Sequence, residues 1–76
     1  MRGREQIVAW MAQGVLQREE LARLFVEFAG YATAVVGDDG EIQVYGGGQC
    51  ACADVLASDH ELMEFIKFVK HTRNIT

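Results

Sequence analysis

The sequence predicts an α+β protein in one small domain over residues 1–76: two N-terminal helices, a small antiparallel sheet, and a C-terminal helix packed on one face. Three observations lead to this fold class. Apolar residues recur at helical spacing in two stretches before residue 30, an Asp-Gly pair separates two β-prone runs, and a capping-box sequence begins at residue 58. A chain of 76 residues, half of them apolar, has the length and composition of a single globular domain.

The first predicted helix covers about residues 3–13. Ile7, Trp10 and Met11 fall at i, i+3 and i+4, which is the spacing of one helical face. Gly14 takes the next position of this stripe, and a glycine there favours the end of a helix because it readily adopts a positive φ.

A second apolar stripe predicts a second helix. Leu21, Leu24, Phe25 and Phe28 recur at helical spacing, and the polar residues 17–20 before them supply the first turn. The two glutamates of that turn favour the positive end of the helix dipole.

The middle of the chain predicts a β-hairpin. Residues 33–36 and 41–45 are β-prone, and the sequence Gly37-Asp38-Asp39-Gly40 lies between them. Along the second run, apolar and polar side chains alternate, so one face of the hairpin is expected to be buried and the other wet.

Two registers of this hairpin are possible. A two-residue loop puts Val35 opposite Val44, whereas a type I turn with Gly40 as a bulge puts Val36 opposite Ile42. We favour the second register because it gives glycine the left-handed position and pairs two large apolar side chains.

Residues 49–53, which follow a run of three glycines, are a possible third strand, but their sequence does not decide whether it forms. They include Cys50 and Cys52, the only cysteines of the chain. A structural zinc site usually takes four ligands from paired motifs, so we expect the two thiols to be reduced and structural, with no metal and no cofactor. The alternative is a small metal or redox module in which both cysteines act with His60.

The C-terminal helix is predicted over about residues 59–72. Ser58 and Glu61 match a capping box, in which each residue bonds the backbone amide of the other. Acidic residues occupy the first turns and basic residues the last, as the helix dipole favours. Its apolar residues at helical spacing are Leu62, Phe65, Ile66 and Val69.

The predicted core collects the apolar residues of these stripes and of the hairpin. A fold of this size buries only about 60% of the surface of its unfolded chain, so few residues can be fully buried. The expected members are Ile7, Trp10, Met11, Leu21, Leu24, Phe25, Phe28, Val36, Ile42, Val44, Leu56, Leu62, Phe65, Ile66 and Val69.

The charge of the chain is concentrated in its middle. The net charge is −4, from 7 basic and 11 acidic residues, and the two ends are each neutral. Asp38, Asp39 and Glu41 lie at one hairpin tip and supply three of the uncompensated charges. We therefore expect these three residues to bind a larger protein partner that has a basic surface.

The predicted function is that of a small acidic, non-enzymatic binding protein that regulates or inhibits a larger protein, as small proteins of phages and mobile elements do. No catalytic residues are expected, because the sequence shows no recognisable motif for an acid–base pair and no cofactor-binding motif. The alternative is a nucleic-acid-binding regulator that uses the first two helices. The second helix disfavours it, because its acidic residues outnumber its basic ones: Glu19, Glu20 and Glu27 against Arg18 and Arg23.

The sequence shows no apolar run near the ~20 residues that a membrane span needs, and no apolar signal core at its N-terminus. We therefore expect a cytoplasmic protein without a membrane partner. We also expect a homodimer, because apolar residues remain outside the stripes. The expected contact patch contains Met63 and Phe68, and the alternative is that these residues pack around helix ends within the monomer.

Overall fold

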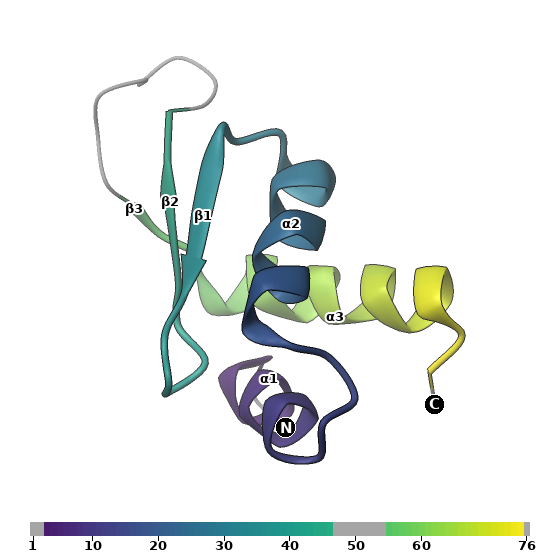
Figure 1. The fold of residues 1–76 in the computed structure, drawn as a ribbon. Coiled ribbons are helices and arrows are strands. Elements are labelled where there is room, and N and C mark those ends of the chain that lie inside the picture. Colours follow the sequence, from purple (N-terminus) through teal and green to yellow (C-terminus); the bar gives the residue numbers. More distant parts are fainter. Residues whose placement is uncertain (1–2, 47–54, 76) are drawn as a thin grey trace.

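The computed structural model describes residues 3–46 and 55–75, and its architecture is α+β, as predicted (Figure 1). Two helices are followed by three strands and a third helix. In chain order the elements are α1 (Gly3–Ala12), α2 (Arg18–Ala29), β1 (Thr33–Val36), β2 (Ile42–Tyr45), β3 (Val55–Leu56) and α3 (Asp59–Arg73).

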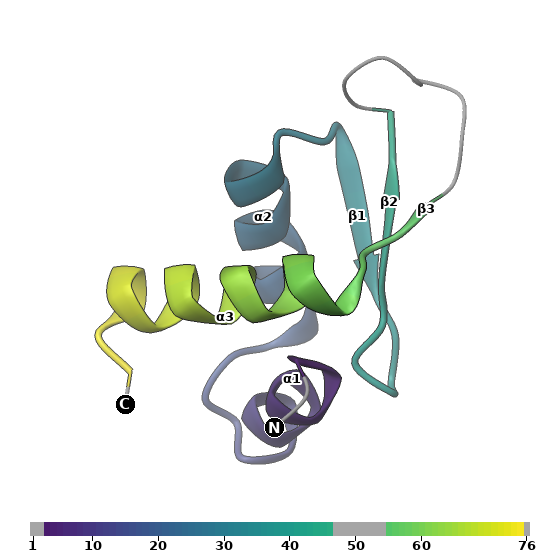
Figure 2. The same ribbon diagram turned by 180° about the vertical axis from the view of Figure 1, so that it is seen from behind.

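The strands form one antiparallel sheet in the order β1-β2-β3, with the helices on one side of it. The view from behind shows the same layering, with α2 and α3 crossing steeply beside the strands (Figure 2). α1 packs on α3, and α2 packs chiefly on β1. As a result, the hairpin tip between β1 and β2 comes down beside α1.

The predicted end of α1 is confirmed, and its geometry explains the tight turn that follows. Gly14 has φ +72°, and its amide donates to the Met11 carbonyl at 3.2 Å. The Val15 amide donates to the Trp10 carbonyl at 2.9 Å. These two bonds form a Schellman motif, which only a residue with a positive φ can complete without strain.

The capping box of α3 is also confirmed. The Glu61 amide donates to Ser58 Oγ at 3.2 Å, and the Ser58 amide donates to Glu61 Oε1 at 3.3 Å. Both partners satisfy amides that a helix N-terminus otherwise leaves unbonded.

The hairpin has the register with the glycine bulge. Val36 pairs with Ile42 and Ala34 with Val44, and Gly40 has φ +85°. The Gly37 amide closes the ladder by donating to the Glu41 carbonyl at 2.8 Å. The alternative two-residue loop is thereby ruled out.

A third strand exists, but it is β3, at Val55–Leu56, where it pairs with β2. Residues 49–53, for which the sequence allows a third strand, lie outside the described residues. The placement of Leu56 in the core is wrong, because its side chain is 51% exposed. Leu56 pairs with Gln43, which in turn pairs with Val35, and these three residues share the open face of the sheet.

The observed core agrees with most of the predicted list and corrects it at three further positions. Met11 and Phe28 are only partly buried and pack against the core. Leu16 was not predicted, yet it is 3% exposed. The buried apolar residues are Ile7, Trp10, Leu16, Leu21, Leu24, Phe25, Val36, Ile42, Val44, Leu62, Phe65, Ile66 and Val69.

Candidate functional site

The acidic hairpin tip rests on the first turn of α1. The contact is made at Gly40, which is buried in the turn between β1 and β2. A Cβ atom on Gly40 would lie 2.4 Å from the carbonyl oxygen of Arg4, closer than any real contact. Residue 40 must therefore be glycine for two reasons: its φ is positive, and there is no room for a side chain.

Ion pairs hold two of the three acidic tip residues. Arg4 Nη2 lies 3.4 Å from Glu41 Oε1, and the guanidinium of Arg18 pairs with the Asp38 carboxylate. These pairs link the tip to α1 and to the start of α2. Because the side chains are partly or largely exposed, each pair adds at most about 1 kcal/mol of stability, and its main effect is on orientation and local charge.

Asp39 has a different role in the turn. Its Oδ1 accepts a hydrogen bond from the Glu41 amide at 3.1 Å, which is a local turn contact between a side chain and the backbone. Among the described residues Asp39 has no cationic partner, and neither has Glu5 on α1.

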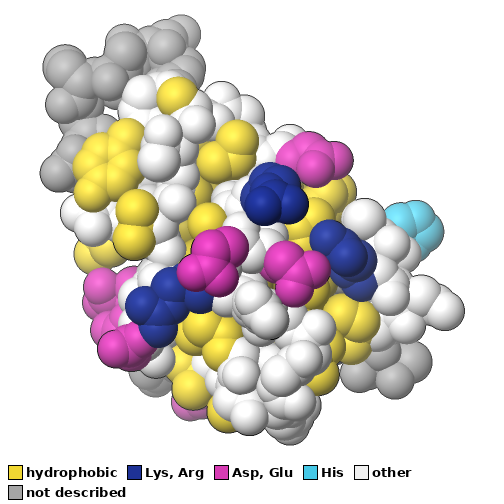
Figure 3. All heavy atoms as spheres, in the orientation of Figure 1, with side chains coloured by type: hydrophobic (Ala, Val, Ile, Leu, Met, Phe, Trp, Pro, Cys, Tyr) yellow, Lys and Arg dark blue, Asp and Glu magenta, His cyan; other side chains and the backbone are white. Residues whose placement is uncertain are grey.

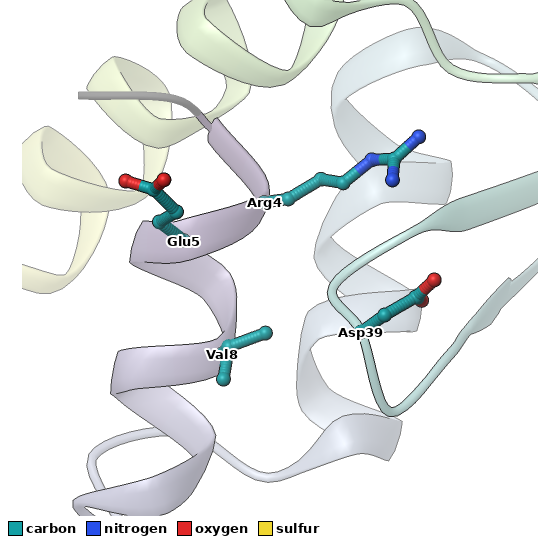
Figure 4. Close-up of a pocket in the computed structure, with 4 residues that line it drawn as sticks. All are labelled: Arg4, Glu5, Val8 and Asp39. Atoms are coloured by element: carbon teal, nitrogen blue, oxygen red, sulfur yellow. The ribbon is translucent and has the colours of Figure 1, made fainter.

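Two adjoining hollows lie between α1 and the hairpin tip. The first has a volume of about 380 Å³ and is lined by Arg4, Glu5, Val8 and Asp39 (Figure 4). The second has a volume of about 280 Å³ and is lined by Val8, Met11, Ala12, Arg18 and Asp38. Since Val8 belongs to both, we treat them as one groove and call it the α1 groove.

The α1 groove follows one face of α1. Its helical members recur at the spacing of a single face, whereas Ile7 and Trp10 on another face are buried in the core. The floor is apolar, formed by Val8, Met11 and Ala12. Charged side chains surround this floor, and an apolar centre with a polar rim is the usual make-up of a protein-binding surface.

The space-filling view separates two kinds of surface. Acidic and basic side chains form a band across the middle of the molecule, over α2 and toward the hairpin tip, while a group of hydrophobic side chains lies over the strands (Figure 3). The exposed apolar residues of the sheet are Val35, Val55 and Leu56, each between 45% and 51% exposed.

Met63 and Phe68, the residues of the predicted contact patch, do not lie side by side on α3. Five residues along a helix correspond to a rotation of about 140°, so the two side chains lie on opposite flanks of the buried face of α3. Met63 is 37% exposed, whereas Phe68 is partly buried. The ring centre of Phe68 lies 5.2 Å from that of Phe28 and 6.4 Å from that of Phe65. The homodimer, and the part of Met63 and Phe68 in it, stay predictions.

The residues of the metal or redox alternative are only partly placed. Cys50 and Cys52 lie outside the described residues, and His60 is exposed in the first turn of α3. Within residues 3–46 and 55–75, no three His, Cys, Asp or Glu side chains come close enough together to hold a metal ion.

The first two helices lack the features of a DNA-reading pair. In a helix-turn-helix the two helices pack on each other, but here α1 packs chiefly on α3 and α2 on β1. The side chains of Arg18, Glu19, Arg23 and Glu27 are all exposed on α2, and their charges cancel. The exposed side chains of α2 therefore carry no excess of basic charge, which is the feature that favours binding to a phosphate backbone.

The fold and the groove define a small α+β protein with a candidate binding surface. None of the helices in the described part of the chain has the length and apolar character needed to cross a membrane. Comparison with models of known protein families, with curated proteins and with solved structures found no match.

Proposed function

We propose that this chain is a small non-enzymatic protein that binds a larger protein and regulates or inhibits it, with the α1 groove and the hairpin tip as the binding face. The observation that supports the proposal is the apolar floor of Val8, Met11 and Ala12 beneath a rim of charged side chains. A protein of 8.4 kDa that covers a surface of its partner can regulate that partner by occupancy alone.

The charge of this face favours a basic partner surface. Its four carboxylates belong to Glu5, Asp38, Asp39 and Glu41, and only two guanidiniums oppose them, so the excess is two negative charges. Such an excess raises the rate of encounter with a basic surface, and salt weakens the effect. The expected partner is therefore a protein with a basic patch around an apolar contact.

The test compares capture by two matched variants. The tagged chain is mixed with lysate of its source cell, and captured proteins are identified by mass. Wild type is compared with Asp38→Lys combined with Asp39→Lys, and with a control that reverses two charges outside the groove, Glu27→Lys with Glu64→Lys. Circular dichroism confirms that each variant is folded.

We expect one protein to be captured by wild type and by the control, and to be lost from the tip variant. Association rates measured on the purified pair should fall most for the tip variant at low salt, and the difference should shrink at high salt. Equal association of both variants at low salt would remove this face from consideration.

A further inference from the structure

The first hollow of the α1 groove has the chemistry to receive a cationic side chain. Glu5 and Asp39 lie at its opposite margins, with Val8 between them, and their carboxylates point away from one another (Figure 4). Among the described residues, neither carboxylate has a cationic partner. The guanidinium of Arg4, which also lines the hollow, pairs with Glu41 instead.

A lysine or arginine side chain fits this arrangement in two ways. Its methylene stem can cover Val8, and its charged head can reach a carboxylate at the margin. Asp39 uses Oδ1 for the Glu41 amide, which leaves its second oxygen for a ligand. An anionic side chain would instead have to compete with Glu41 for Arg4.

The second hollow has a different chemistry. Val8, Met11 and Ala12 contribute apolar side chains, and the remaining lining residues, Arg18 and Asp38, neutralise each other as an ion pair. An apolar side chain in this hollow would bury apolar area, which favours binding. The ion pair of Arg18 and Asp38 would stay in contact with solvent. Methionine adapts its shape readily to such a contact.

We propose that the α1 groove binds a segment of the partner protein that carries a basic side chain next to an apolar one. The stem of the basic side chain covers Val8 and its charged head reaches one of the two carboxylates at the margin, while the apolar side chain packs on Met11 and Ala12. The two hollows share Val8, so neighbouring positions of one short segment can fill both. This inference rests on the proposed function and specifies the chemistry of its binding face.

Short synthetic peptides test the inference without any partner from the cell. The ¹⁵N-labelled full chain is titrated with three capped peptides that differ only at two central positions: lysine–leucine, glutamate–leucine and lysine–serine. Amide resonances are followed by NMR. The lysine–leucine peptide should shift Glu5, Val8 and Asp39 in a saturable way, and each of the other two peptides should bind at least about fivefold more weakly.

A charge-neutral variant tests whether the two carboxylates, and not the shape of the hollow, cause the preference for the lysine peptide. Glu5→Gln with Asp39→Asn removes both charges, while the amide oxygen of residue 39 can still accept the bond from the Glu41 amide. This variant should lose most of the preference for lysine over glutamate. The matched control, Glu27→Gln with Glu64→Gln, removes the same charge outside the groove and should keep the preference.

Three outcomes overturn the inference: no saturable shift by the lysine–leucine peptide, shifts that map to the sheet or to α3, or a lysine preference unchanged in the neutral variant. The two proposals can fail separately. If a captured partner depends on the hairpin tip but the peptides do not bind, only this inference fails. If the peptides bind and no partner is lost on charge reversal, the proposed function fails.

Discussion

Replacing Gly40 with alanine should destabilise the protein far more than the same change at Gly30. The two glycines share a left-handed backbone, with φ +85° at Gly40 and +81° at Gly30. They differ in surroundings. A Cβ on Gly30 meets no atom within 4 Å, whereas a Cβ on Gly40 would lie 2.4 Å from the Arg4 carbonyl oxygen.

The magnitude follows from two separate costs. An L-residue in the left-handed region costs about 1–2 kcal/mol, and both variants carry this cost. Ordinary contact begins at 3.4 Å, so at Gly40 the turn or α1 must move by about 1 Å. Forcing atoms into a packed site of this kind costs a further ~1–3 kcal/mol. Gly40→Ala should therefore lose about 2–5 kcal/mol of the free energy of unfolding, and Gly30→Ala about 1–2 kcal/mol.

Urea unfolding followed by tryptophan fluorescence measures both losses. Trp10 is the single tryptophan, it belongs to α1, and it is 3% exposed, so its emission reports on the helix that the added methyl group would displace. The quantity of interest is the difference between the two variants. Losses that agree within about 0.5 kcal/mol would refute the close approach of the turn to α1 and leave only the backbone effect.

Two further expectations concern the core and the cysteines. Leu16→Ala should lower the free energy of unfolding by about 2–5 kcal/mol and Tm by roughly 10 °C or more. Val15→Ala, at a neighbouring side chain that is 43% exposed, should lower the free energy of unfolding by less than ~1 kcal/mol. Equal Tm values for the two variants would contradict the burial of Leu16. A chelator should leave Tm unchanged, and Cys50→Ala with Cys52→Ala should keep partner binding. A chelator-induced fall in Tm would instead favour the metal module.

Local signals predicted most of the fold because they act over a few residues. The hairpin register follows from one glycine in the turn and one pair of opposed apolar residues, Val36 and Ile42, and the capping box follows from two side chains three positions apart. Leu16 escaped prediction because it lies between two helices and belongs to no stripe. It is buried where the Schellman turn brings the chain back, with its amide 3.5 Å from the Trp10 carbonyl.

The candidate site was less accessible to sequence reasoning, because it depends on contacts between distant parts of the chain. Counting charges located the acidic tip, but the pairing of Arg18 with Asp38 joins residues 20 positions apart. Val8 lies off the first apolar stripe, and that second face of α1 gains its neighbours from the hairpin tip and from Arg18 at the start of α2. A helical-wheel plot shows the apolar face of Val8, Met11 and Ala12, but not what lies opposite to it.

Gly40 links the stability of the fold to the shape of the candidate site. The α1 groove has α1 on one side and the hairpin tip on the other, and the distance between them is set where Gly40 meets Arg4. A side chain at residue 40 would push the two sides apart, weaken the pairing of Arg4 with Glu41, and widen the first hollow around Val8. The bare backbone at this position therefore supports both the turn and the narrow apolar floor on which the proposed recognition of a basic and an apolar side chain depends.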